Sequence, residues 1–335
     1  MADEPFIRIN PESLRTFQRS NLNRDTIFTL LKSVAQVETS GCWAGVSDNF
    51  DKQLISSGVL QWNYGQSSIQ DLLVGFRRSM GTQFSAFVTT TMPRFGRLVF
   101  SDRCLGLTPR GEAHACSADF LDPADQDKKK LRNGLTEEMT ALFEHNEMIQ
   151  IQMDRVMAVM EKTLDFSKRL FGEQFVNERN FHWMLDIIVQ QGGFDELEKF
   201  KEASDHGWAY ATSRDLAHKK MTARGILIWY AGHATSPHQG GLDCDWRYNI
   251  EKWAALIKSD QLDDDRFRLF LMSWVRARTA SGENGRWQAL AFERRAKIGL
   301  GIGSVGGSSA QRNNNYDCKM PTPSDMAAMM LSLQP

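Results

Sequence analysis

Segments with the apolar spacing of amphipathic helices occupy most of this chain, and they constrain its fold more than any other feature. From about Arg24 to Gly41 the apolar residues recur at helical spacing, and Gly41 ends the pattern: Ile27, Leu30, Leu31, Val34, Ala35 and Val37. Beyond Gly65 most of the sequence again has helical spacing. The pattern therefore predicts a mainly α protein with a large helical part.

One stretch interrupts the helices, between Cys42 and Tyr64. It contains the run VSDNFDKQLISSGVLQWN, in which helical spacing is lost and Gly, Ser, Asn and Asp are frequent. Such a composition is typical of short strands joined by turns. We therefore expect a small β-hairpin region directly after the first long helix, which makes the fold class α+β, mainly α.

Changes in composition indicate where the parts of the chain begin and end. Residues 1–23 are expected to form an N-terminal extension, and residues 24–307 one domain that joins the first helix and hairpin (24–75) to a helical lobe (76–307). The tail, residues 308–335, is Gly-, Ser- and Asn-rich and then Met-rich, which predicts a loop followed by a short helix or a loose terminus. A chain of 335 residues, 41% of them hydrophobic, can fill a sizeable core.

The stretch from Leu135 to Phe171 keeps helical spacing without a Pro and is longer than most helices of globular proteins. It predicts two helices, or one helix that bends. Four methionines share one stripe of this stretch, and we expect them in the core rather than on a recognition surface: Met148, Met153, Met157 and Met160.

The balance of charges excludes the class of proteins that bind nucleic acid or anionic membranes through the electrostatic field of a large positive net charge. Forty Lys and Arg residues stand against 41 Asp and Glu residues, for a formal net charge of -1, so no nucleic-acid partner is expected. No window approaches the roughly 20 apolar residues of a membrane-spanning helix, so no membrane insertion is expected either. The first residues, MADEPFIRIN, lack the positive start and apolar run of a secretory signal, which predicts a chain that is cytoplasmic at synthesis.

The cysteines and histidines do not have the spacing of a metal site. The five cysteines are scattered without a CxxC pair, and the seven histidines include no HExxH motif. The acidic run 263–265 is more typical of a helix start than of a calcium loop. No cofactor is therefore expected. Cys104 and Cys116 flank a turn, and they are either buried thiols or, in an oxidising compartment, a disulfide.

Two carboxylates stand where the first helix gives way to the hairpin region. Glu38 lies on the last turn of the helix, and Asp51 follows thirteen residues later, so a hairpin that folds back over the helix end brings them face to face across a groove. The sequence neighbours of Glu38 are apolar and are expected to raise its pKa: Val37, Trp43 and Phe50. Asp51 has more polar neighbours and is expected to stay ionised. A protonated acid beside an ionised carboxylate is the arrangement that cleaves glycosidic bonds.

Each carboxylate also has a plainer explanation. Glu38 has the position of a solvated side chain near a helix end, which is where isolated Glu residues commonly occur. Asp51 belongs to an NFD triplet, which is typical of an Asx-turn that merely orders a hairpin. Asp48, three residues earlier, is the alternative for the role of second carboxylate.

The segment GVLQWNYGQ places aromatic and amide side chains between two glycines. Trp62 and Tyr64 offer flat apolar faces for pyranose rings. Gln61, Asn63 and Gln66 can donate and accept hydrogen bonds with hydroxyl and N-acetyl groups. Alternate residues of a strand face opposite sides, so only one of the two sets can line a groove fully. The aromatic pair fits a hairpin core equally well.

The runs VETSG, NFD and SSGVLQWNYGQSSIQDLL together resemble the catalytic segment of bacterial lysozyme-like and chitosanase-like glycoside hydrolases. The positions that match its pattern are Glu38, Asp51, Gly58, Leu60, Gln61, Trp62, Asn63, Gly65, Gln66 and Leu72. Two later runs, MLDIIVQQGG and ERRAKIGLGIGSVGG, also resemble the family, so the similarity spans residues 38–306. The chain departs from the pattern at Ser67 and Ser68, where Gly is commoner, at Gln191, where Asn is usual, and at Lys52, where Gly often follows the Asp.

The resemblance implies a lysozyme-like fold and a peptidoglycan hydrolase, a muramidase, in which Glu38 is the general acid and Asp51 or Asp48 is the base or electrostatic partner. It also implies that Gln190 contacts substrate, although this residue has the position of a helix C-cap neighbour. The alternatives are a chitosanase, a lytic transglycosylase that uses Glu38 alone, and a non-catalytic glycan-binding protein of the same fold. Inversion and retention of configuration both stay open.

The family includes cell-wall hydrolases that contact-dependent secretion machines deliver between bacteria, and phage-linked lysins. The resemblance therefore implies action in the periplasm or outside the cell after non-classical delivery. The partners that it implies are peptidoglycan or a related amino-sugar polymer and, for a delivered antibacterial toxin, an immunity or inhibitor protein or a component of the secretion machine.

Overall fold

The computed structural model describes residues 6–39, 42–49, 54–107, 116–234, 243–259, 261–280 and 285–305, together with 328 and 331. The side chains of residues 37–39, 117–118, 243–244 and 286 lie outside this described part, as does almost all of the predicted tail. The described residues are mainly helical with a small three-stranded antiparallel sheet, which confirms the predicted class, α+β and mainly α. The chain divides into two compact units, Met1–Lys162 and Thr163–Pro335.

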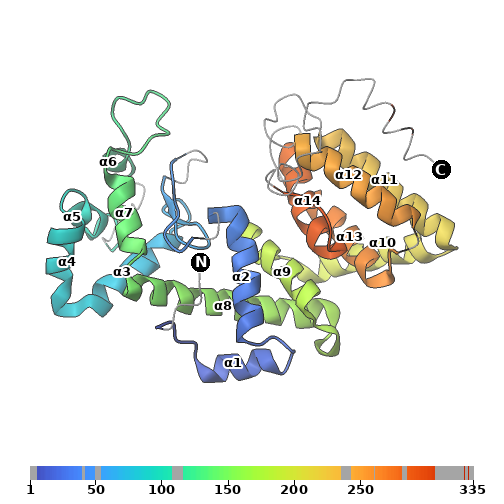
Figure 1. Cartoon of the computed structure of the whole chain (residues 1–335), viewed down its shortest axis with the longest axis horizontal. Coiled ribbons are helices and arrows are strands. Elements are labelled where there is room, and N and C mark those ends of the chain that lie inside the picture. The colour runs from blue at the N-terminus through green and yellow to red at the C-terminus, as the bar shows by residue number, and fades with distance from the viewer. Residues whose placement is uncertain are drawn as a thin grey trace. The chain divides into compact units, whose positions relative to one another are not determined.

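The first unit contains the sheet and the helices that precede and follow it (Figure 1). Its strands are β1 (Val46–Ser47), β2 (Ser56–Ser57) and β3 (Trp62–Asn63). Its helices are α1 (Pro11–Gln18), α2 (Arg24–Thr39), α3 (Ser68–Met80), the 3-10 helix η1 (Gly81–Gln83), α4 (Phe84–Thr91), α5 (Gly96–Val99), α6 (Ser117–Phe120), α7 (Leu135–Phe143) and the larger part of α8 (Asn146–Phe171).

Helix α2 forms where the apolar spacing predicts it. Asn23 caps the helix, because its side-chain oxygen accepts hydrogen bonds from Thr26 N at 2.9 Å and from Thr26 Oγ1 at 3.1 Å. The apolar face is buried, with 2% exposure or less at Ile27, Leu30, Leu31, Val34 and Ala35. The helix ends at Thr39, two residues before the predicted stop at Gly41, which lies outside the described residues.

The sheet consists of three very short strands that follow one another in the chain. Antiparallel pairing joins β1 to β2 and β2 to β3, with these partners: Val46 and Ser57, Ser47 and Ser56, Ser56 and Asn63, Ser57 and Trp62. The prediction of short strands joined by turns is therefore confirmed. A sheet this small is not stable in isolation, so the hairpin region depends on the helices and loops around it.

The long stretch from Leu135 to Phe171 is two helices, α7 and α8, which is the first of the two alternatives that the sequence left open. The methionine stripe lies in the core, as predicted, with 6% exposure or less at Met148, Met153, Met157 and Met160. The boundary between the two units falls inside α8, after Lys162, where the sequence pattern has no break. The single domain expected over residues 24–307 therefore contributes to both units.

The described part of the predicted N-terminal extension packs into the first unit. Phe17 and Leu22 are fully buried, and Ile7 is 4% exposed. Gln150 of α8 exchanges two hydrogen bonds with the backbone of Arg8, of 2.8 and 2.9 Å. Residues 6–23 are therefore a structural part of this unit.

A disulfide joins Cys104 to Cys116, and both residues are fully buried. Their Cα atoms lie 5.4 Å apart. Of the two states that the sequence left open for this pair, the structure has the oxidised one. An ion pair between Arg103 and Asp119 spans the same connection, so two links tie α6 to the segment that follows α5.

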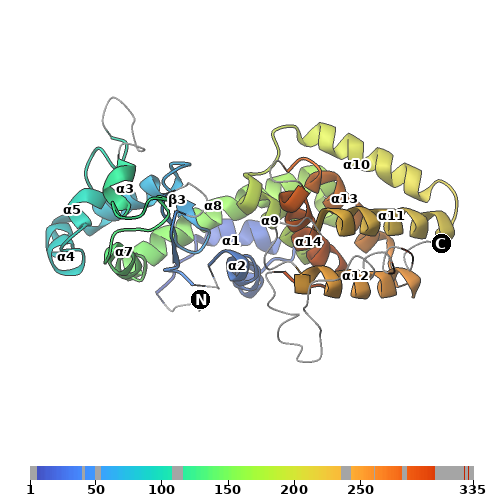
Figure 2. The same cartoon turned by 90° about the horizontal axis from the view of Figure 1, so that it is seen from above.

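The second unit is a bundle of helices. Its elements are the end of α8, the 3-10 helix η3 (Glu173–Phe175), α9 (Glu178–Gln191), α10 (Leu197–Thr212), α11 (Leu216–Ala234), α12 (Asp243–Lys258), α13 (Asp264–Ala277) and α14 (Arg286–Leu300). In Figure 2, α11 lies between α10 and α12 and contacts both. The most extensive contact within the bundle is between α13 and α14.

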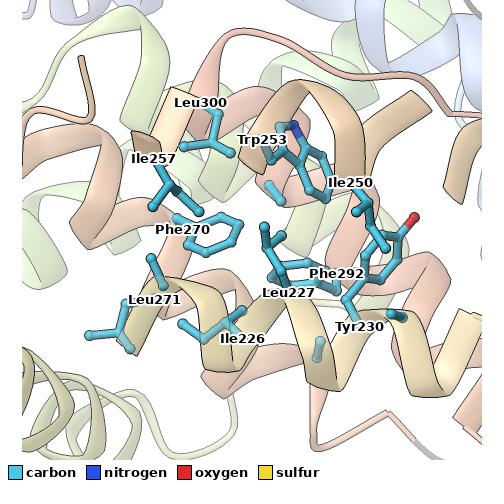
Figure 3. Packing of buried hydrophobic residues seen from close by; sticks show 14 of the residues in the cluster. Ile226, Leu227, Tyr230, Ile250, Trp253, Ile257, Phe270, Leu271, Phe292 and Leu300 are labelled. Carbon is cyan, nitrogen blue, oxygen red and sulfur yellow. The ribbon is translucent and has the colours of Figure 1, made fainter. Parts of the chain in front are cut away.

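Aromatic rings fill the core of this bundle (Figure 3). Trp253, Phe270 and Phe292 meet there from three helices, with ring centroids 5.3 to 6.2 Å apart. Tyr230 of α11 packs against both Trp253 and Phe292. Each fully buried ring of this size stabilises the fold by roughly 1.5–3 kcal/mol before losses of entropy, so α11 to α14 form one cohesive core.

The buried side of α14 combines apolar and charged residues. Three successive charged residues of this helix, Glu293, Arg294 and Arg295, are buried, at 0%, 6% and 0% exposure. Ion pairs and hydrogen bonds with α9 and α11 offset part of the cost of this burial. Helical spacing is kept by the buried apolar residues Ala289, Phe292, Ala296 and Leu300, but it does not reveal the buried charges.

Candidate functional site

The predicted acid and its candidate partners belong to the connection from α2 through β1 to β2. Glu38 is the penultimate residue of α2, and its side chain lies outside the described part. Trp43, in the turn that follows, is buried at 7% exposure. Asp48 directly follows β1 and is exposed, whereas Asp51 lies among the residues that are not described. The described residues nearest to Asp51 in the sequence are Asn49 and Leu54.

Asn49 is hydrogen-bonded to Leu54 and to a distant segment of the chain. Its side-chain oxygen accepts a hydrogen bond from Leu54 N at 2.8 Å. Its Nδ2 donates to the carbonyl oxygen of Lys128 at 2.8 Å, and its backbone N–H donates to that of Lys129 at 3.0 Å. Asn49 is only 9% exposed, so these bonds are shielded from water.

The turn between β2 and β3 is held by α7 and α8. Val59 N donates to Oε1 of Gln152, a fully buried residue of α8, at 3.0 Å. Gly58 has φ +82°, and a Cβ atom there would lie 2.6 Å from Gln152 Oε1 and 2.8 Å from a ring carbon of Phe143. Both the backbone conformation and the close approach require glycine at this position.

The five residues predicted to bind sugar differ in their exposure. Gln66 is exposed and Gln61 is half-buried. Trp62, Asn63 and Tyr64 are buried, at 6%, 8% and 0% exposure.

Two of the buried residues have clear structural partners. The ring of Tyr64 lies 5.2 Å from that of Phe120, and burial raises the pKa of its hydroxyl far above the ordinary value. The side-chain oxygen of Asn63 accepts a hydrogen bond from Gln66 N at 2.8 Å. Of the two explanations offered for the aromatic pair, this environment favours the hairpin core.

Ser67 and Ser68 differ in what their conformation and contacts require. Ser67 has φ +58° and ψ +19°, the left-handed conformation that glycine adopts without strain. Ser68 has a role that glycine lacks, because its hydroxyl accepts a hydrogen bond from Asn63 N at 2.8 Å and so links β3 to the start of α3.

Gln190, the remaining predicted substrate contact, belongs to the second unit. It is half-buried on α9, and its side-chain oxygen accepts a hydrogen bond from Arg295 Nη2 at 2.8 Å. Asp186, one turn earlier, accepts hydrogen bonds of 2.9 and 2.7 Å from Arg294 and lies 3.5 Å from Arg295. Although burial opposes ionisation of Asp186, the two arginines hold its pKa below the ordinary value.

A second buried polar group in this unit surrounds Glu293. Burial, with a contribution from the negative charge of Asp245, raises the pKa of Glu293 well above its ordinary value. Tyr230 Oη donates a hydrogen bond of 2.6 Å to one of its oxygens. Nearby, Asn249 accepts from Ser304 N at 2.6 Å and donates to Ser304 O at 2.9 Å, which fixes the chain beyond α14. These contacts tie α11, α12 and α14 to the chain beyond α14.

No group of three His, Cys, Asp or Glu side chains that could hold a metal ion occurs among the described residues. The helices in the same part of the chain include none with the length and apolar character to span a membrane.

Sequence reasoning did not identify Asn49 or Gln152 as residues that position the site. The NFD triplet did indicate a turn ordered by an Asx side chain, and its first residue, Asn49, makes a bond of that kind with Leu54 N. No local sequence pattern indicates the role of Gln152, because the N–H group that it binds belongs to Val59, 93 residues away in the sequence.

Comparisons of the chain with protein-family models, with curated proteins and with solved structures find no match.

Proposed function

We propose that this chain is a lysozyme-like glycoside hydrolase that cleaves peptidoglycan between its amino sugars, with Glu38 as general acid. One observation carries the proposal. Glu38 is in the last turn of α2, and a small antiparallel sheet follows it, whose first connection contains Asp48 and Asp51. An acid at a helix end followed by such a sheet is the order that the resemblance to lysozyme-like hydrolases implies.

The reaction requires Glu38 to hold a proton until it reaches the glycosidic oxygen. We expect the apolar sequence neighbours of Glu38, Val37 and Trp43, to favour its protonated form. Transfer of that proton to the glycosidic oxygen breaks the bond between this oxygen and the anomeric carbon, while positive charge develops on the sugar ring. An ionised carboxylate then stabilises this charge, or removes a proton from the attacking water.

Asp51 is the first choice for that ionised carboxylate, and Asp48 is the second. Asp51 has the position of the second carboxylate in the pattern that the chain resembles. Asp48 is exposed and lies directly between β1 and the buried Asn49.

Gln61 and Gln66 are the strongest candidates for hydrogen bonds to the sugar, because they keep exposed surface next to β3. Both side chains can donate to and accept from the N-acetyl group of an amino sugar. The buried ring of Tyr64 is better suited to the hairpin core than to stacking on substrate.

The disulfide between Cys104 and Cys116 supports action outside the cytoplasm. Disulfides persist in oxidising compartments and are rare where thiols are kept reduced. Peptidoglycan lies in such a compartment, so delivery by a secretion machine, with an immunity protein as partner, fits the same proposal.

The test compares the purified protein with Glu38→Gln on peptidoglycan sacculi, by loss of turbidity and by mass spectrometry of the released fragments. Glu137→Gln is the matched control, because Glu137 is an exposed glutamate of α7 in the same unit. We expect Glu38→Gln to lower the rate at least about a hundredfold, because general acid catalysis contributes that much or more, and the control to keep the wild-type rate.

The products decide between the remaining alternatives. Reducing ends on muramic acid support a muramidase, and 1,6-anhydro ends identify a lytic transglycosylase. Equal release by wild type and Glu38→Gln, or release by neither, excludes the enzymatic proposal.

A further inference from the structure

The disulfide between Cys104 and Cys116 joins two segments of the first unit that differ in how they are held. The segment before Cys104 is anchored to α3. Phe100 stacks on Phe76 of that helix, with ring centroids 6.0 Å apart, and its carbonyl oxygen accepts a hydrogen bond of 3.3 Å from Arg77 Nη1. Cys104 therefore follows a segment that a long helix holds in place.

The segment that begins at Cys116 packs on the small sheet. We call residues 116–132 the cover. Phe120 of the cover lies against Tyr64, which directly follows β3, with ring centroids 5.2 Å apart. Farther along the cover, the carbonyl oxygen of Lys129 accepts a hydrogen bond of 3.0 Å from the N–H group of Asn49, two residues beyond β1. The cover thus contacts the residues that flank both outer strands of the sheet.

The cover has little stability of its own. Its helix, α6, has four residues, far fewer than an isolated helix needs. A hydrogen bond of 2.9 Å from Arg132 N to the carbonyl oxygen of Phe120 closes the cover into a hairpin, and an isolated hairpin is marginal in water. The ion pair between Arg103 and Asp119 joins half-exposed side chains, and such pairs contribute little. The disulfide is therefore the strongest restraint at the start of the cover.

We propose that oxidation of Cys104 and Cys116 fixes the cover on the sheet, and that the sheet stays uncovered while the two thiols are reduced. The thiolate of one cysteine attacks the S–S bond of a disulfide oxidant and forms a mixed disulfide, which the second cysteine then displaces. The pair gives up two electrons and two protons, and the oxidant leaves as two thiols. This device goes beyond the proposed function and does not depend on it.

The burial of the disulfide makes the oxidised state persistent. Cys104 and Cys116 are both fully buried, so a reductant reaches them only after the cover has opened. A chain made where thiols are kept reduced would have a loose cover, and transfer to an oxidising compartment would fix it. Because Tyr64 is also fully buried, its segment reports directly on whether the cover is in place.

The test follows hydrogen–deuterium exchange by mass spectrometry in the full chain, in peptides that cover residues 54–66 and 116–132. It compares the oxidised protein, the protein kept in dithiothreitol, and the double substitution Cys104→Ser and Cys116→Ser. Cys42→Ser is the matched control, because it removes an exposed cysteine and leaves the pair intact. We expect reduction and the double substitution to lower protection of both segments about a hundredfold, while peptides of α3 and of α9 to α14 do not change.

Oxidised glutathione should restore the protection of the reduced wild type and of Cys42→Ser, and leave the double variant unchanged. Equal protection of residues 54–66 in the oxidised and reduced protein overturns the proposal. A loss of protection throughout the chain also overturns it, because the disulfide then stabilises the whole fold without controlling the cover.

A second variant links the disulfide to the contact between the cover and the sheet. Phe120→Ala removes the ring that packs on Tyr64 and keeps both cysteines. In the oxidised variant we expect residues 54–66 to lose protection about as much as in the reduced wild type, and reduction to add little. Losses that add up in full would show that disulfide and ring act independently, which contradicts the proposal. Because no readout uses cleavage of a polymer, failure of the proposed function leaves these outcomes unaffected.

Discussion

Replacing Asn49 with Ala tests whether one side chain holds Leu54 and the turn at residues 128–130 together. The substitution removes two hydrogen bonds of 2.8 Å, from Leu54 N to Asn49 Oδ1 and from Asn49 Nδ2 to Lys128 O. Leu54 is 5% exposed, so its N–H group loses its partner away from water. Each lost hydrogen bond lowers the free energy of unfolding by about 1 kcal/mol, and the unpaired buried N–H group lowers it by about 1 kcal/mol more. We therefore expect the first unit to be destabilised by about 3 kcal/mol.

Hydrogen–deuterium exchange followed by mass spectrometry locates the effect. Protection should fall by up to about a hundredfold in peptides that cover residues 46–57 and 121–131, with no change in α9 to α14. Asn49→Asp is the matched control, because it keeps an acceptor for Leu54 N and removes only the donor to Lys128 O. In this control only the peptides from 121–131 should lose protection. Wild-type exchange of both segments in Asn49→Ala would refute the reasoning.

Three further predictions concern stability. The double substitution Cys104→Ser and Cys116→Ser should lower the free energy of unfolding of the first unit by about 3 kcal/mol, because the disulfide closes a loop with a sequence separation of 12. Urea unfolding under oxidising conditions measures this loss, and a value below about 1 kcal/mol contradicts the prediction. Ser67→Gly should raise that free energy by about 1 kcal/mol, because it relieves the left-handed conformation at φ +58°, and destabilisation by this variant is the contrary result. Glu293 has a raised pKa in the folded protein, so the folded state binds its proton more tightly and stability falls as pH rises above the unfolded pKa of about 4.3. Glu293→Gln keeps an acceptor for Tyr230 Oη and should show a shallower loss of stability with pH in thermal unfolding, whereas parallel pH profiles of variant and wild type would contradict a raised pKa of Glu293.

Apolar spacing in the sequence predicted where helices occur but not which charged residues they bury. It located α2 to within two residues of its end and separated the hairpin region from it. The same criterion did not reveal that the interior positions of α14 include Glu293 and two arginines. The ion pairs that make such burial tolerable connect α14 to Asp186 of α9, 108 residues earlier. No local pattern contains that information.

The exposure of the candidate site residues was also beyond what the sequence could predict. Alternation along a strand predicted that Asn63 and Trp62 lie on opposite sides with only one side covered, whereas both are buried because β3 is only two residues long and covered on both sides. The surroundings of Tyr64 likewise depend on Phe120, which packs on it from 56 positions away. The sequence indicated the left-handed conformation of Ser67 only indirectly, because glycine is commoner at this position of the pattern that the chain resembles.

Strands of two residues cannot fix a catalytic loop by their own pairing, so the geometry of the proposed site depends on later segments of the chain. Each support is a single specific contact: Gln152 holds Val59, Phe120 covers Tyr64, and the carbonyl oxygens of Lys128 and Lys129 hold Asn49. Because Phe120 belongs to α6, which follows Cys116 of the disulfide, a restraint on α6 also restrains Phe120. Under the proposed function, substitutions at these supporting residues should therefore change the rate without contacting the sugar. The proposal thus assigns the reacting groups to residues 38–72 and their positioning to contacts made by residues 104–152.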